Sequence, residues 1–213
     1  MKQRKRKFLL TSMTGLLKGA KMKILGILAS PRKKGNSDIL LNEALRAARD
    51  SGADTEKLVI YDMDFKGCIS CGGCAKTGVC VLKDDMTPLY SKLNSADAVI
   101  IAAPIYFAGA PAQLKAMIDR CQSEWVAKYV LKKRKAQNEK RKANGAFICV
   151  SGHKEDTLYK FTRKTIEVFF KTMNIDFTEE LFFGGAGRAG DIKSIKGALE
   201  KAYKSGKDLS GAK

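Results

Sequence analysis

The chain has 213 residues, of which 45% are hydrophobic and 29% charged, a composition typical of a globular protein and not of a disordered chain. No apolar run is long enough to span a membrane, which excludes a transmembrane helix. The formal net charge is +18, but residues 1–21 and 132–142 each contain seven Lys or Arg residues. The rest of the chain is only mildly basic, so the charge alone does not indicate nucleic-acid binding.

The N-terminal residues 1–21 are expected to form a basic, disordered extension. The apolar stretch Phe8–Leu17 follows basic residues as in a secretory signal, but Thr, Ser and Gly interrupt it and no small-x-small cleavage site follows. We therefore expect one domain over 22–206 and a C-terminal tail over 207–213.

Strand and helix patterns alternate from residue 23 onward. An almost continuous apolar run predicts a strand at 23–29, and further strands are expected at 57–61, 97–103, 146–150 and 175–183. A helix is expected after each strand. The first is capped by Asn36 or Ser37 and ended by Gly52, and the second is opened by Thr87-Pro88. The third has Leu114, Met117, Ile118, Cys121 and Trp125 on one face, the fourth, over 157–173, has Leu158, Phe161, Thr165, Val168 and Phe169 inward, and the fifth spans 190–206. This alternation predicts an α/β fold, a flavodoxin-like three-layer sandwich whose five-stranded parallel sheet has the order 2-1-3-4-5.

Ligands of such sheets bind beyond the carboxyl ends of the strands, so the five loops at these ends are the candidate ligand-binding segments. They are 30–37, 66–83, 104–111, 151–156 and 184–190.

The first of these loops has the features of a phosphate site. It opens a helix whose N-terminus presents free N–H groups and the positive end of its dipole. Further donors come from Ser30, Arg32, Asn36 and Ser37. An ordinary capped turn remains the alternative, and the spacing does not match a Walker loop.

The loop after the third strand brackets two aromatic residues with small ones, as the wall of a site for a flat ring would. Together with the first loop it favours a mononucleotide that carries a flat ring system. Its residues are Pro104, Ile105, Tyr106, Phe107 and Gly109.

Four of the six cysteines lie within 13 residues, at Cys68, Cys71, Cys74 and Cys80. Thiolates ligate iron-sulfur clusters, and spacings of two residues let successive thiols converge on one site. A structural zinc, a redox disulfide and unligated thiols are the alternatives. The other two cysteines, at 121 and 149, fit apolar patterns and are expected in the core.

The motifs Ser30-Pro31-Arg32-x-x-Gly35-Asn36-Ser37 and Pro104-Ile105-Tyr106-Phe107-x-Gly109 resemble those of the NADPH-dependent FMN reductase family. With Cys68-x2-Cys71-x2-Cys74-x5-Cys80 between them, the chain resembles the iron-sulfur flavoproteins of that family over about 22–190. The resemblance implies that the first loop holds the FMN phosphate, that the loop over 104–109 borders the isoalloxazine, and that the four cysteines, as metal ligands, hold a [4Fe-4S] cluster. The bacterial ferredoxin run has three residues before its last cysteine and a Pro after it, whereas here five residues precede Cys80 and Val81 follows it. This departure favours a single cluster bound by all four cysteines.

The resemblance implies a flavin-dependent oxidoreductase that passes electrons from a donor such as ferredoxin through the cluster to FMN and on to a small acceptor. It also implies a homo-oligomer, a homodimer or homotetramer. The alternative is a cluster-free reductase for FMN or quinones that takes hydride from NAD(P)H as co-substrate. No catalytic side chain is assigned, because the cofactor carries the chemistry.

Three remaining features receive weaker interpretations. Gly185-Ala186-Gly187-Arg188-Ala189-Gly190 imitates a dinucleotide fingerprint, but too few residues follow it, so we expect a glycine loop near the ligand mouth. The single histidine, His153, follows the fourth strand and is either a flavin contact or a surface residue. The basic segment 132–142 lacks interleaved aromatics, so nucleic acid is not the expected partner; docking of an acidic electron carrier is the hypothesis. Exposed thiols favour a reducing cytoplasm.

Overall fold

The computed structural model describes residues 21–133 and 142–211. All but the last residue of the predicted N-terminal extension, and most of the basic segment 132–142, lie outside the described residues. No helix within the described part of the chain has the length and apolar character that crossing a membrane requires.

The sheet has five parallel strands in the order β2-β1-β3-β4-β5, which confirms the predicted fold class and strand order. The strands are β1 (Lys23–Leu28), β2 (Asp54–Val59), β3 (Ala98–Pro104), β4 (Ala143–Val150) and β5 (Ile175–Phe183). The central strand β3 is buried from its first to its sixth residue, because helices cover both faces of the sheet.

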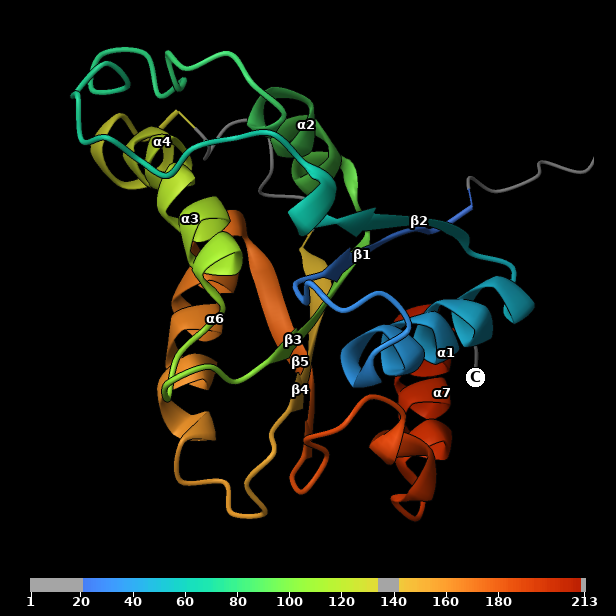
Figure 1. Cartoon of the computed structure of the whole chain (residues 1–213). Helices are drawn as coiled ribbons and strands as arrows, with labels where there is room; N and C mark the ends of the chain where they lie inside the picture. Colours follow the sequence, from blue (N-terminus) through green and yellow to red (C-terminus); the bar gives the residue numbers. More distant parts are fainter. Residues whose placement is uncertain (1–20, 134–141, 212–213) are drawn as a thin grey trace, which may run out of the picture.

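Helices pack on both faces of the sheet, with α1 and α7 on one face and α2, α3 and α6 on the other (Figure 1). Their bounds are α1 (Asn36–Asp50), α2 (Met86–Ser95), α3 (Ala112–Arg120), α4 (Gln122–Trp125), α6 (Tyr159–Met173) and α7 (Ala198–Leu209), with single turns at η1 (Ile60–Asp62), η2 (Val126–Val130) and η3 (Asp191–Ser194). Two separate apolar cores therefore form, one on each side of the sheet.

The predicted inward face of the helix over 157–173 is partly wrong. Phe161 and Val168 are 65% and 54% exposed, whereas Phe169 is buried as expected. The buried face of α6 contains Ile166 and Phe170 instead. Apolar residues occur on both sides of this helix, so spacing alone could not select the side that packs on the sheet.

Two helix boundaries also differ from the expectation. The helix after β3 is broken at Cys121, where α3 gives way to α4, and the last helix runs over Ala198–Leu209 rather than 190–206. The segment before α7 contains two left-handed glycines, Gly190 and Gly197, which end any regular helix there. Cys121 and Cys149 are buried, as predicted.

Candidate functional site

The loop after β1 leads directly into the N-terminus of α1 at the carboxyl edge of the sheet. The hydroxyl-bearing residues Ser30 and Ser37 are 4% and 3% exposed, and the Ser30 Oγ accepts the backbone N–H of Arg32 at 3.3 Å. Gly35, not Asn36 or Ser37, precedes the first helical residue, and no side chain caps the helix. The open N-terminal turn of α1 thus faces this loop with its dipole, as a phosphate site requires.

The side chain of Asn36 is occupied by the glycine-rich loop that follows β5. Its Nδ2 donates to the carbonyls of Ala186 and Arg188 at 3.0 and 2.8 Å, and its Oδ1 accepts the N–H groups of Gly190 and Ile192 at 2.9 and 3.3 Å. Two donors and two acceptor positions are the full capacity of an amide. The cap predicted for Asn36 is therefore absent because its side chain binds the neighbouring loop.

The glycine-rich loop belongs to the same edge of the sheet as the first loop. The Arg32 guanidinium donates to the Gly187 carbonyl at 3.3 Å, and the Gly185 N–H donates to the His153 carbonyl at 3.1 Å. A Cβ on Gly184 would lie 2.4 Å from the Lys154 carbonyl oxygen, so only glycine fits there. His153 itself is exposed and has its own N–H bound to the Ser151 hydroxyl.

The loop after β3 forms a tight turn in which Tyr106 and Gly109 exchange two backbone hydrogen bonds. Phe107 and Ala108 at its tip adopt left-handed φ angles of 47° and 59°, which non-glycine residues rarely adopt and which concentrate at functional sites. The Phe107 side chain is fully exposed. The turn therefore presents aromatic surface at the mouth of the sheet, close to Pro104 and Ile105.

The first and third loops approach each other through η1. The Lys33 ammonium pairs with the Asp62 carboxylate at 2.9 Å, and burial, followed by the neighbouring Tyr106, raises the pKa of Tyr61. The predicted phosphate and ring loops are adjacent because they follow β1 and β3, which are neighbouring parallel strands whose carboxyl ends lie at the same edge of the sheet.

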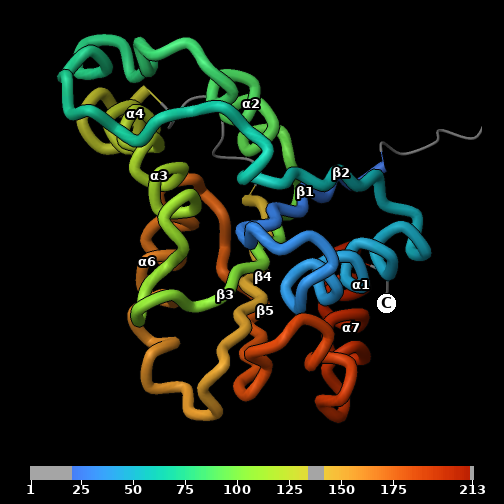
Figure 2. The backbone as a smooth tube through the Cα atoms, in the orientation of Figure 1, coloured from blue at the N-terminus to red at the C-terminus, as the bar shows by residue number. Residues whose placement is uncertain are grey.

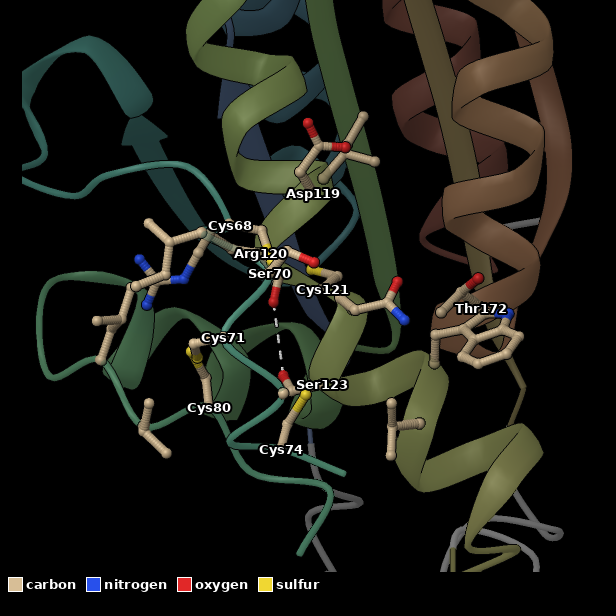
Figure 3. Close-up of a pocket in the computed structure, with 18 of the residues that line it drawn as sticks. Cys68, Ser70, Cys71, Cys74, Cys80, Asp119, Arg120, Cys121, Ser123 and Thr172 are labelled. Atoms are coloured by element: carbon tan, nitrogen blue, oxygen red, sulfur yellow. Dashed lines mark hydrogen bonds between the residues drawn. The ribbon is translucent and has the colours of Figure 1, made fainter. Parts of the chain in front are cut away.

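The four cysteines lie elsewhere, on a long loop between η1 and α2 that extends over α3 and α4 (Figure 2). All four thiols are free and line one cavity of about 560 Å³, whose opposite wall comes from α3, α4 and α6 (Figure 3). Burial raises the pKa of Cys74, and the three neighbouring thiols raise it further. The cavity lining includes none of the residues of the first or third loop.

The donor set of this cavity fits a thiolate-bound metal group. Four sulfur ligands without a histidine suit iron-sulfur clusters or zinc and not hard cations. Gly78 adopts a left-handed φ of 75°, which lets the loop turn between Cys74 and Cys80. Within residues 21–133 and 142–211, no three potential metal ligands converge on one point.

Sequence reasoning did not identify Arg120, which the structure places in the wall of the cysteine cavity. Its side chain is 1% exposed and forms a two-pronged ion pair with Asp84, at 2.6 and 3.0 Å. The only available signal is a charged residue on the otherwise apolar face that contains Leu114 and Met117.

Comparison with known families gives one match over most of the described fold. Residues 22–158 match the family described as NADPH-dependent FMN reductase. An iron-sulfur flavoprotein of Methanosarcina thermophila is 37% identical over 154 residues, which are 72% of this chain and 74% of that protein. Another, from Methanocaldococcus jannaschii, is 40% identical over 99 residues, about half the length of each protein.

Solved structures share the fold at lower sequence identity. An NAD(P)H:quinone oxidoreductase from Methanothermobacter marburgensis superposes with a TM-score of 0.68 at 20% identity, covering 89% of this chain and 96% of that one. An FMN-dependent NADH-azoreductase from Bacillus anthracis in complex with FMN has a TM-score of 0.66 at 16% identity, covering 88% and 99%. These likenesses support the flavodoxin-like architecture.

Proposed function

Because the chain belongs to the NADPH-dependent FMN reductase family, among its iron-sulfur flavoproteins, it is a flavin-dependent oxidoreductase, and we propose that it also holds a [4Fe-4S] cluster on Cys68, Cys71, Cys74 and Cys80. The observation that carries this proposal is that four free thiols of one loop line a single cavity. When bound, FMN exchanges electrons singly or as hydride, and a cluster exchanges them one at a time.

In this proposal the first and third loops hold the flavin. The N-terminal turn of α1 binds the phosphate with Ser30, Arg32 and Ser37, while Asn36 fixes the adjoining glycine loop. The loop with Pro104, Ile105, Tyr106, Phe107 and Gly109 borders the ring system. The support is the adjacency of these loops and the match of residues 22–158 to the FMN reductase family.

We further propose that electrons enter from a carrier such as ferredoxin and leave to a small acceptor, and that the protein acts as a homodimer or homotetramer in the cytoplasm. The names of the iron-sulfur flavoprotein relatives support the cluster, and the family name supports a role for NADPH. A cluster-free NAD(P)H-dependent reductase is the outcome that the experiment must separate from this proposal.

The test is anaerobic purification followed by a visible spectrum and assays of iron and acid-labile sulfide. We expect flavin bands together with a broad absorbance that bleaches on reduction, and about four irons and four sulfides per chain. Cys74→Ala should lose the iron and keep the flavin, whereas the control Cys149→Ala, outside the cavity, should keep both. A flavin spectrum without iron would instead indicate the cluster-free reductase.

A further inference from the structure

The cysteine loop is fastened at its base by contacts that do not involve any cysteine. The backbone N–H of Asp64 donates to the Asp85 carboxylate at 2.7 Å, and the Asp85 N–H donates back to the Asp64 carbonyl at 3.3 Å. The two ends of the loop thus lie side by side before any ligand binds, and the segment between them has a closed base.

Arg120 joins the two ends of the loop a second time, next to this base. Its Nη1 donates to the Lys66 carbonyl at 2.8 Å and to the Asp84 carboxylate at 2.6 Å, and its Nη2 donates to the other Asp84 oxygen at 3.0 Å. One guanidinium from α3 therefore binds both the beginning and the end of the loop. Only the planar fork of an arginine can make these three bonds at once.

The surroundings of Arg120 fix the guanidinium in place. The Arg120 carbonyl accepts the Tyr90 hydroxyl of α2 at 2.8 Å, so the two helices meet at this residue. The Asp84 carboxylate also accepts the N–H of Met86, at the start of α2. The hydrogen bond to Arg120 is the largest cause that lowers the pKa of Asp84, which keeps this carboxylate charged.

The charge of Arg120 also lies in the wall of the cysteine cavity. The residue lines the cavity together with all four loop cysteines. Its Nε is buried without a hydrogen-bond partner among the described residues, so the guanidinium is held through its two Nη atoms. A nearby positive charge stabilises an anionic group in such a cavity.

We propose that Arg120 is the positioning residue of the cysteine loop: it clasps Lys66 and Asp84 so that the thiols face one cavity, and it supplies a fixed positive charge there for an anionic thiolate-bound group. The clasp exists without a cluster, whereas the role of the charge rests on the proposed function. The two parts therefore have separate readouts.

The clasp is tested on the metal-free protein by limited trypsin digestion followed by mass spectrometry. Arg120 binds the carbonyl of the Lys66–Gly67 bond, which trypsin must attack, and Lys76 lies at the exposed part of the same loop. Arg120→Gln should raise cleavage after Lys66 at least tenfold and leave cleavage after Lys76 within twofold. Equal cleavage after Lys66 in the wild type and the variant would overturn the clasp.

Arg120→Gln leaves the partly buried Asp84 carboxylate without its partner, so a second variant protects the test against misfolding. Arg120→Gln combined with Asp84→Asn removes both charges and should unfold cooperatively while still exposing the Lys66–Gly67 bond. Arg163→Gln, which removes a half-exposed arginine paired with Glu180, is the control and should not change cleavage after Lys66. A protected Lys66 in the folded double variant would also reject the clasp.

The charge is tested on the protein reconstituted with iron and sulfide. Arg120→Gln should disfavour the reduced, more negative form about tenfold, which for one electron lowers the midpoint potential by about 59 mV. Arg120→Lys should keep the potential near that of the wild type but lose protection of Lys66, since lysine retains the charge without the fork. An unchanged potential in Arg120→Gln would overturn the charge role. If the wild type takes up no iron, the proposed cluster fails, and the digestion still decides the clasp.

Discussion

The two candidate regions of the molecule are held together in different ways. At the flavin loops, a single buried amide, that of Asn36, binds the glycine loop through four hydrogen bonds, and two loop backbones pass too closely for any side chain at Gly184. The cysteine loop is exposed over most of its length. The Asp64–Asp85 pair and Arg120 fasten it near its ends, and between them the Lys133 ammonium donates to the Thr77 carbonyl. The first region is thus tied together by buried hydrogen bonds, whereas the second is held mainly at its base.

The largest expected effect comes from breaking the fastening of the cysteine loop. Asp84→Asn should lower the free energy of unfolding by about 3 kcal/mol at pH 7, because it leaves the guanidinium of Arg120 buried without a charged partner. Urea denaturation measures this loss. Asp119→Asn, which removes an exposed carboxylate paired with Lys115 on the same helix, is the control and should cost less than about 0.5 kcal/mol.

The stability that the Asp84 carboxylate contributes to the wild type depends on pH. The folded-state pKa of Asp84 is lowered, so its contribution is complete above the unfolded pKa of about 4 and is lost as the pH falls through the folded value. The wild type should therefore lose stability more steeply below about pH 4 than Asp84→Asn does. Parallel acid limbs for the two proteins would show that the ion pair contributes no such stability.

A somewhat smaller effect is expected from the flavin side. Asn36→Ala should cost about 2 kcal/mol of unfolding free energy and weaken FMN binding at least tenfold, because buried N–H and carbonyl groups of the glycine loop lose their partner. Fluorescence titration with FMN and urea denaturation measure the two effects. Asn42→Ala, on the exposed side of the same helix, should leave FMN affinity within twofold. An equal loss in both variants would contradict a specific role of the Asn36 hydrogen bonds.

Backbone proximity at the flavin side can be tested with two glycines of one loop. Gly184→Ala should destabilise the protein by about 1 to 2 kcal/mol, since the new methyl group meets the Lys154 carbonyl oxygen and the backbone must shift. Gly187→Ala meets only an ordinary contact, 3.7 Å from Gly152, and should change the unfolding midpoint little. Similar midpoints for the two variants would argue against a tightly packed loop.

The smallest effect is expected at the exposed ion pair between Lys33 of the first loop and Asp62 of η1. Asp62→Asn removes the partner of Lys33, but both side chains are more than half exposed. The change in unfolding free energy should stay below about 0.5 kcal/mol and disappear in high salt. A larger, salt-resistant loss would mean that this contact contributes to holding the first loop against η1.

The sequence sufficed for the fold because the three central strands are short apolar runs and every strand is followed by a helical pattern. β5 was predicted over 175–183, where the structure has it, and the parallel order followed from the alternation of strands and helices. The face of α6 was misassigned because Phe161 and Val168 continue a second apolar stripe that the sheet does not cover. Local spacing identifies an amphipathic helix, but tertiary packing selects the buried side.

The motifs of the candidate site could be predicted from the sequence, whereas the long-range contacts that hold its loops in place could not. The cysteines and the two flavin loops are visible as local patterns of residue types. The partners of Asn36 are 150 to 156 residues away, and the carboxylate that Arg120 binds is 36 residues away. Such pairings depend on how the sheet brings loops together, and no local spacing encodes them.

The closed base between Asp64 and Asp85 determines how freely the segment between these residues can be replaced. A segment whose two ends are already in contact can be replaced by one of another length, because the entropic cost of closing a loop grows only slowly with its length. Residues 67–83 could be exchanged for a short turn while β2, α2 and the sheet keep their positions. The fold thus allows one flavin-binding body to gain, lose or exchange its cysteine loop without rebuilding its core.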